Sequence, residues 1–127
     1  MKLRIKGNSL RFRVTRSELA KLIDTGRIGE TIFFSPDEYS SLTYALELQP
    51  SSNSATLRYR QSEIVIVLST QEVGGWADSD RVGIYATLDL GARGILDLLV
   101  EKDFACLDLS DAENVDTFPN PNAGAAC

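Results

Sequence analysis

Cationic side chains recur at alternate positions in three short segments of the chain, and they are the residues best suited to binding chemistry. They are Lys2, Arg4, Lys6, Arg11, Arg13, Arg58 and Arg60, of which all but Lys2 are candidate anion ligands. Because successive side chains of a strand point to opposite faces, each segment presents its cations on one face. Arginine forks match the oxygens of phosphate and carboxylate groups. If these strands are neighbours, they predict a face or groove for a small anion or a protein partner.

The alternative is a solvated face on which these cations pair with carboxylates of neighbouring strands. The candidate partners are Glu47, Glu63, Asp89, Asp97 and Glu101, and each exposed pair adds only about 0.2–1 kcal/mol. The net charge of −5 is unevenly divided, since residues 1–60 carry 10 Lys/Arg and 6 Asp/Glu (+4) and residues 61–127 carry 3 and 12 (−9). An acidic chain is a poor binder of phosphate backbones, so no nucleic-acid partner is predicted.

The absence of histidine removes the commonest general base and the commonest metal ligand. No catalytic residue and no cofactor are therefore predicted. The candidate metal ligands are Cys106, Cys127, Glu101, Asp103 and Asp116. Three states stay open for the two cysteines: free thiols, a disulfide between them, or metal ligands together with nearby carboxylates.

Two aromatic residues are candidates for interactions. Trp76 follows two glycines and precedes a polar stretch, which predicts a loop in which it plugs the end of a barrel or anchors a partner. Phe118 lies in a segment that Pro119 and Pro121 keep extended, and it packs on the domain or docks into the groove of a neighbour.

The elements that position these residues begin with a hairpin. Residues 2–6 and 10–14 alternate apolar and cationic side chains around a Gly-Asn turn. A Thr-x-x-Glu capping box and a later glycine predict a helix over residues 16–24. Further strands are predicted at residues 31–35, 42–48, 55–60, 64–68, 82–90 and 94–102, with a short helix from Thr70 that Gly74 and Gly75 limit. No repeat of about 20–50 residues is apparent.

Strands that follow one another as hairpins indicate a mainly antiparallel arrangement. We expect a β-rich α+β fold, with one antiparallel curved sheet or a partly closed barrel of about seven or eight strands and one or two short helices. Residues 1–109 form the β-rich domain. Residues 110–127, rich in Asp, Asn, Pro, Gly and Ala, form an extended C-terminal tail packed on it.

Two strings near the C-terminus and the opening of the chain carry a family resemblance. The strings 101–107 (Glu-Lys-Asp-Phe-Ala-Cys-Leu) and 118–121 (Phe-Pro-Asn-Pro), with the opening 1–11, resemble a family of small uncharacterised bacterial proteins, a domain of unknown function. The resemblance spans nearly the whole chain and implies a bacterial single domain. The first residues lack the apolar core of a secretion signal, and no apolar run reaches the roughly 20 residues of a membrane helix. A cytoplasmic location without a membrane partner is therefore expected.

These observations predict a non-enzymatic binding or interaction module, with catalysis and oligomeric state left open. One alternative is a metal-assisted phosphohydrolase, because alternating cations on antiparallel strands resemble in outline the triphosphate-tunnel enzymes. That resemblance implies phosphate contacts from Arg4, Arg11, Arg13, Arg58 and Arg60 and metal ligation by Glu101 with Asp103. Those enzymes open with Glu-x-Glu-x-Lys, whereas this chain has Lys2-x-Arg4-x-Lys6 and so lacks the corresponding carboxylates. The other alternative is a structural protein that interacts through its C-terminal tail.

Overall fold

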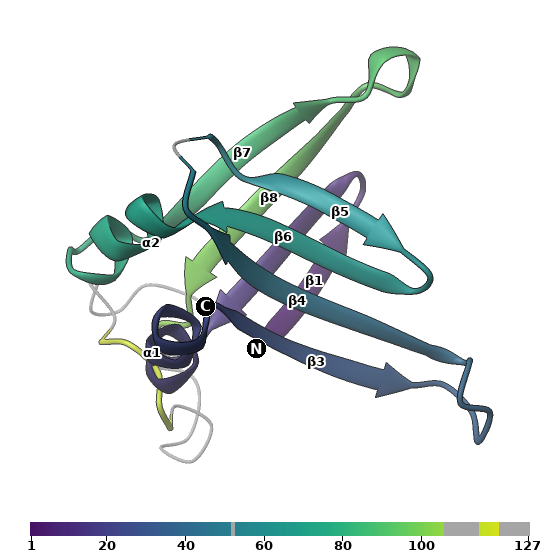
Figure 1. Cartoon of the computed structure of the whole chain (residues 1–127), viewed down its shortest axis with the longest axis horizontal. Helices are drawn as coiled ribbons and strands as arrows, with labels where there is room; N and C mark the ends of the chain where they lie inside the picture. The colour runs from purple at the N-terminus through teal and green to yellow at the C-terminus, as the bar shows by residue number, and fades with distance from the viewer. Residues whose placement is uncertain (52, 106–114, 120–127) are drawn as a thin grey trace.

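Two four-stranded sheets and two α-helices make up the part of the chain that the structure describes. The computed structural model describes residues 1–51, 53–105 and 115–119. Sheet A has the strand order β1-β2-β8-β7 and sheet B the order β3-β4-β6-β5 (Figure 1). The elements are β1 (Lys2–Lys6), β2 (Ser9–Val14), α1 (Arg16–Thr25), β3 (Arg27–Phe33), β4 (Ser41–Gln49), β5 (Thr56–Arg60), β6 (Glu63–Ser69), α2 (Thr70–Ala77), β7 (Gly83–Asp89), the 3-10 turn Gly91–Arg93 and β8 (Ile95–Lys102).

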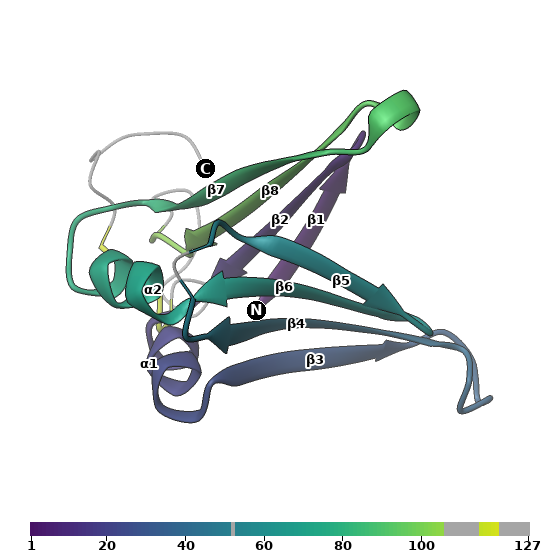
Figure 2. The ribbon, with the colours of Figure 1, turned by 45° about the horizontal axis from the view of Figure 1, so that its top comes forward.

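The two helices connect the sheets and so determine which strands each sheet contains. The hairpins β1–β2, β3–β4, β5–β6 and β7–β8 are antiparallel, whereas the central pairs β2–β8 and β4–β6 are parallel. The connection through α1 carries the chain from sheet A to sheet B, and α2 carries it back. The β-rich α+β prediction is confirmed, but the single curved sheet or partly closed barrel is wrong. Because the helices interrupt the run of hairpins, two sheets form, and they diverge away from the helices (Figure 2).

The chain repeats one structural unit of the form strand–strand–helix–strand–strand. Adding 54 to the residue numbers of β1 (2–6) gives β5 (56–60), and the same shift carries β2 onto β6 and β4 onto β8. A shift of 56 carries β3 (27–33) onto β7 (83–89). The registers correspond as well, since the pair Lys6–Ser9 becomes Arg60–Glu63. Sheets A and B are therefore equivalent surfaces that carry different side chains.

The apolar faces of both sheets and both helices meet in one core. Phe12 of β2 contacts Tyr44 of β4 edge to face, with ring centroids 6.0 Å apart. Leu22 of α1 and Trp76 of α2 occupy equivalent positions of the repeat, and both are fully buried. The two helices cover the same end of the sheets (Figure 2). Each helix thus contributes two buried side chains to the core, Leu19 and Leu22 from α1 and Val73 and Trp76 from α2.

Helix α1 begins and ends where local sequence predicts. In its capping box, the side chain of Thr15 accepts a hydrogen bond from the backbone of Glu18, and the Glu18 carboxylate accepts one from the backbone of Thr15. Its last turn closes at Gly26, whose φ of 82° suits glycine.

Helix α2 is longer than the short helix predicted from Thr70. Ser69 caps the helix, which continues through Gly74 and Gly75 to Ala77. Glycine lowers helix propensity by about 1 kcal/mol per residue, but the helix buries an apolar face against the core, which offsets that cost. The predicted loop around Trp76 is therefore wrong.

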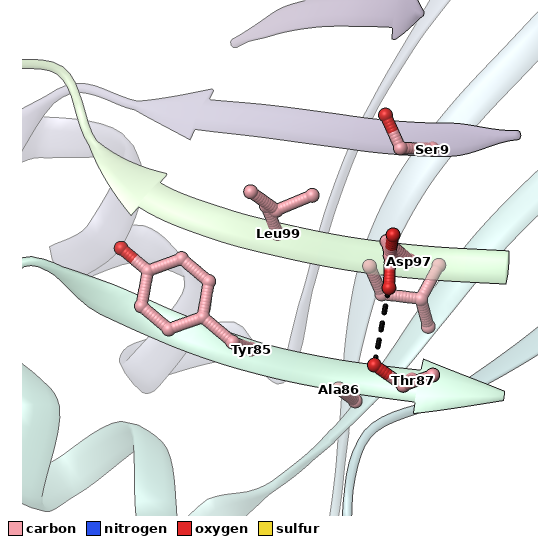
Figure 3. A pocket seen from close by; sticks show the side chains of 7 residues that line it. Ser9, Tyr85, Ala86, Thr87, Asp97 and Leu99 are labelled. Carbon is pink, nitrogen blue, oxygen red and sulfur yellow. Dashed lines mark hydrogen bonds between the residues drawn. The ribbon is translucent and has the colours of Figure 1, made fainter. Parts of the chain in front are cut away.

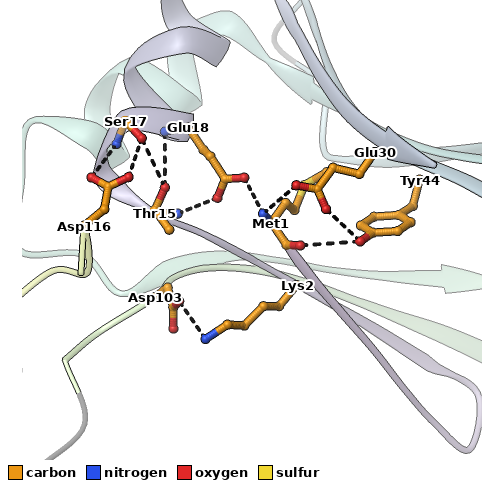
Figure 4. Close-up of polar contacts among 9 residues, drawn as sticks. All are labelled: Met1, Lys2, Thr15, Ser17, Glu18, Glu30, Tyr44, Asp103 and Asp116. Atoms are coloured by element: carbon orange, nitrogen blue, oxygen red, sulfur yellow. Dashed lines mark hydrogen bonds and ion pairs between the residues drawn. The ribbon is translucent and has the colours of Figure 1, made fainter. Parts of the chain in front are cut away.

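A polar network joins the start of the chain to α1 and sheet B (Figure 4). The amino group of Met1 pairs with Glu18 and, at 3.2 Å, with Glu30, which also accepts a 2.8 Å hydrogen bond from Tyr44. Burial alone would raise the pKa of Glu18, but hydrogen bonds from the Met1 amino group and Thr15 outweigh it and lower the pKa. Burial, with the hydrogen bond to Glu30, raises the pKa of Tyr44 to about 12. At neutral pH the network therefore combines a charged Glu18 with a protonated phenol.

Residues 115–119, the described part of the C-terminal segment, lie against the domain. Phe118 forms a β-bridge with Phe104, and their ring centroids are 6.1 Å apart. Asp116 accepts hydrogen bonds from the backbone and hydroxyl of Ser17, and these bonds, the hydroxyl's above all, lower the pKa of Asp116 (Figure 4). The rest of the predicted tail lies outside the described residues. No helix in the described ranges is long and apolar enough to cross a membrane.

Candidate functional site

The outer face of sheet A, turned away from the core, collects the cations of the first hairpin. Leu10 and Phe12 of β2 are buried in the core, so strand alternation directs Ser9, Arg11 and Arg13 outward. Antiparallel pairing with β1 sets Lys2, Arg4 and Lys6 opposite these three residues. The hairpin therefore has one apolar face and one cationic face.

Side chains on this outer face form three rows that cross all four strands, from β1 through β2 and β8 to β7. The Lys2 row is Lys2–Arg13–Glu101–Gly83, the Arg4 row is Arg4–Arg11–Leu99–Tyr85 and the Lys6 row is Lys6–Ser9–Asp97–Thr87. The β1–β2 half of the face carries the cations. The β8–β7 half carries carboxylates, a hydroxyl, an aliphatic side chain and an aromatic ring.

Two adjoining hollows lie along the Arg4 and Lys6 rows. The smaller, of about 100 Å³, is lined by Arg4, Lys6, Ser9, Arg11 and Leu99. The larger, of about 420 Å³, is lined by Ser9 and Leu99 and, further along the rows, by Tyr85, Thr87 and Asp97 (Figure 3). Because Ser9 and Leu99 line both hollows, the surface is continuous from the cations to the aromatic ring.

Two carboxylates, one on β8 and one just after it, pair with two of the five cations that β1 and β2 carry on this face. Arg11 pairs with Glu101 at 3.1 Å (Nε to Oε1), and Lys2 pairs with Asp103 at 3.0 Å (Nζ to Oδ2). Tyr85 donates a 2.8 Å hydrogen bond to Glu101, and burial together with this bond raises the pKa of Tyr85 to about 12. The phenol therefore stays protonated at neutral pH, and Glu101 holds it in place.

Three cations of this face lack such a partner. Arg4, Lys6 and Arg13 lie beyond 4.0 Å of every carboxylate in the described residues. Arg4 lies directly opposite Arg11, and Lys2 directly opposite Arg13. Like charges directly opposite each other on antiparallel strands destabilise the pairing. An anion between Arg4 and Arg11 would relieve this repulsion.

The equivalent face of sheet B carries its own carboxylates. Arg58 and Arg60 lie on β5 in sheet B, so the three cationic strands are not all neighbours and the seven cations do not share one face. Arg58 donates a 2.8 Å hydrogen bond to Glu47, which also pairs with Arg27 at 2.8 Å. The hydrogen bond from Arg58, aided by Arg27, lowers the pKa of Glu47. The equivalent of the Arg4 row is Arg58–Val65–Ala45–Gly29, which has neither a second arginine nor an aromatic ring.

The candidate metal ligands do not form a cluster in the described residues. Glu101 and Asp103 are two positions apart, on the same side of the chain, but each pairs with a cation. Asp116 instead binds Ser17 at the start of α1. Cys106 and Cys127 lie outside the described residues. Within ranges 1–51, 53–105 and 115–119, no three Asp, Glu or Cys side chains lie close enough to hold a metal ion.

Both aromatic candidates pack within the domain. Trp76 is fully buried, and its Nε1 has no hydrogen-bond acceptor in the part of the chain that is described. Phe118 is half-buried beside Phe104, and Nζ of Lys102 lies 5.4 Å from its ring centre. The ring of Trp76 is therefore not available to a partner on the surface.

A triphosphate tunnel would need a closed barrel with charged side chains pointing inward. The two described sheets do not close into a barrel, and their facing sides form the apolar core. The cations of β1 and β2 point to the outer face.

Sequence reasoning missed the half of the face that comes from β7 and β8. Tyr85, Thr87 and Leu99 are not among the predicted site residues, and Asp97 is predicted only as an ion-pair partner. The sequence signal that could have found them is their alternation along the two strands predicted at residues 82–90 and 94–102, which places them on one face of each strand. Their place beside Arg11 depends on the parallel pairing of β2 with β8, which no local pattern specifies.

The fold and this face together define a two-sheet α+β domain with a partly unneutralised basic surface. The family model DUF7009, described as a family of unknown function, matches residues 1–122, and the chain belongs to this family. The resemblance to an uncharacterised family, inferred from the sequence, is thereby confirmed. No curated protein and no solved structure matches the chain.

Proposed function

We propose that this protein is a binding module for a small anion, held between Arg4 and Arg11 on the outer face of sheet A. The observation that carries the proposal is the hollow of about 100 Å³ in which these two arginines, directly opposite on β1 and β2, meet Lys6. Of the three cations, Arg11 alone has a carboxylate partner within the described residues. Phosphate and carboxylate groups carry oxygens that guanidinium groups bind in pairs.

Sheet B supports the proposal by contrast. There, Glu47 bridges Arg58 and Arg27, so a carboxylate of the chain itself balances the charge. At the position equivalent to Ser9, sheet B has Glu63, which adds a further carboxylate. Sheet A has no such carboxylate within reach of Arg4 in the described chain, so a ligand would supply the missing negative charge.

Replacing Arg4 with glutamine tests the proposal, and the repeat supplies a matched control in Arg58→Gln. We expect inorganic phosphate, titrated by calorimetry at low ionic strength, to bind Arg4→Gln about 10- to 100-fold more weakly than the unchanged protein. Loss of a charge-assisted hydrogen bond costs about 1.5–3 kcal/mol, which corresponds to that factor. Arg58→Gln should keep the affinity, because Arg58 lies on sheet B and contacts Glu47.

The salt dependence of the phosphate affinity provides a second test by the same titration. The site is exposed, so added sodium chloride should screen the cations and weaken phosphate binding. The proposal would be contradicted if the unchanged protein bound no phosphate, or if Arg4→Gln and Arg58→Gln weakened binding equally.

A further inference from the structure

We infer that the ligand is an organic phosphate whose body carries hydroxyl groups, as in a sugar monophosphate. The inference rests on the proposed function, because it places the phosphate group between Arg4 and Arg11. It adds the larger hollow, which extends along the Arg4 and Lys6 rows to β7. Size, polarity and the exposed aromatic ring of this hollow each point to the same class of ligand.

The size of the surface exceeds what a bare phosphate would occupy. The larger hollow has a volume of about 420 Å³, within the range of about 300–1,000 Å³ typical of small-molecule sites. Four neighbouring strands span about 14 Å, three inter-strand spacings. A phosphate group at the β1–β2 end therefore leaves the β8–β7 half for the remainder of a ligand. Ser9 and Leu99, which line both hollows, lie between the two parts.

Asp97 determines which chemical groups of a ligand can bind in the β8–β7 half of the surface. Its Oδ1 accepts a 3.1 Å hydrogen bond from Thr87, whereas its Oδ2 accepts none from the described residues. Figure 3 shows one oxygen directed at Thr87 and the other directed away from it. A half-buried carboxylate of this kind accepts hydrogen bonds from hydroxyl groups and repels a second phosphate. The ligand therefore has one anionic end and a hydrogen-bond donor at the other.

Tyr85 and Leu99 add an apolar surface beside Asp97. They lie directly opposite each other on β7 and β8, and 53% of the surface of Tyr85 is exposed. Its hydroxyl is bound to Glu101, which fixes the ring position and leaves the ring itself as the contact surface. Sugar rings combine hydroxyl groups with C–H faces, and the C–H faces pack on aromatic rings. Asp97 and Tyr85 together thus match a hydroxylated ring.

Calorimetric titrations with inorganic phosphate, glucose 6-phosphate and ribose 5-phosphate test this inference. We expect at least one sugar phosphate to bind the unchanged protein about tenfold more tightly than phosphate does, the gain of a charge-assisted hydrogen bond. Asp97→Asn should remove that gain while phosphate binds at least as well as before, because phosphate gains no hydrogen bond from Asp97 and loses only a nearby negative charge. The control is Asp24→Asn, the same substitution at an exposed position of α1, which should leave all affinities unchanged.

The outcomes separate this inference from the proposed function. If phosphate binds but neither sugar phosphate binds more tightly, the inference is wrong and the anion site remains. The same holds if Asp97→Asn weakens phosphate and sugar phosphate equally. If none of the three compounds binds, both the inference and the proposed function are wrong. Circular dichroism of each variant confirms that it is folded before its affinity is compared.

Discussion

Replacing Trp76 with alanine is expected to lower the free energy of unfolding by about 3–5 kcal/mol, the cost of removing a large aromatic side chain from a core. Trp76 is fully buried and is the largest side chain that α2 contributes to the core shared by both sheets. Small domains have only about 5–15 kcal/mol of stability, so the loss would be a large part of the total. Urea denaturation followed by circular dichroism measures it, because Trp76 is the only tryptophan and its fluorescence is lost with it.

The variant Trp76→Phe separates the contribution of packing to stability from that of hydrogen bonding. The indole Nε1 has no acceptor among the described residues. Phenylalanine therefore removes a buried donor that makes no hydrogen bond and so does not stabilise the fold. We expect this variant to lose only about 1–2 kcal/mol, since the phenyl ring keeps most of the contacts. A loss below about 1 kcal/mol in Trp76→Ala would contradict the buried position of α2.

Gly83→Ala is expected to destabilise the protein by about 1–3 kcal/mol through overpacking. A Cβ atom at Gly83 would lie 2.5 Å from the backbone oxygen of Val100 and 2.9 Å from Cγ of Glu101. The backbone of β8 cannot yield as a flexible side chain does, so strands β7 and β8 must shift. The midpoint of urea denaturation measures the effect.

The control is Gly75→Ala, which should change stability in the opposite direction. Gly75 lies in α2, and a Cβ atom there would have no atom within 4 Å apart from its chain neighbours and the backbone of its own helix. Alanine is the better helix former, so we expect a gain of about 0.5–1 kcal/mol. If Gly83→Ala and Gly75→Ala had the same small effect, the close approach of β7 to β8 at Gly83 would be wrong.

Local patterns in the sequence were enough to predict the parts of the fold that neighbouring residues determine. The alternation around Gly7 predicts the first hairpin, which the structure has as β1 and β2. The capping box of Thr15 and Glu18 predicts the start of α1 at Arg16. In both cases the interacting residues are a few positions apart, so their side chains specify the geometry directly.

Pairings between distant strands could not be predicted in this way. The face beside Arg11 is completed by Leu99, 88 positions later, through the parallel pair β2–β8. The same limitation left open which sheet holds Arg58, whose alternation fits either sheet equally well. A register or strand order between remote segments depends on the packing of the whole core, which α1 and α2 direct.

The repeat is not apparent in the sequence, because few equivalent positions keep the same residue. Those that do include Leu3 and Leu57, Arg4 and Arg58, Glu18 and Glu72, Leu42 and Leu96, and Glu47 and Glu101. The change in shift from 54 to 56 at β3 and β7 breaks the alignment further. Sheets require a pattern of burial rather than particular residues, so the fold repeats while its surface diverges. That divergence distinguishes the basic face of sheet A from the equivalent face of sheet B, where Glu47 pairs with both Arg58 and Arg27.

The most direct test of the central claim is a phosphate titration followed by amide chemical shifts in two-dimensional NMR. The claim is that the anion binds between Arg4 and Arg11 on sheet A and not at the equivalent face of sheet B. We expect the largest shift changes at residues 4–11, with little change at the equivalent residues 58–65. Equal changes in the two segments, or changes spread over the whole surface, would contradict the claim.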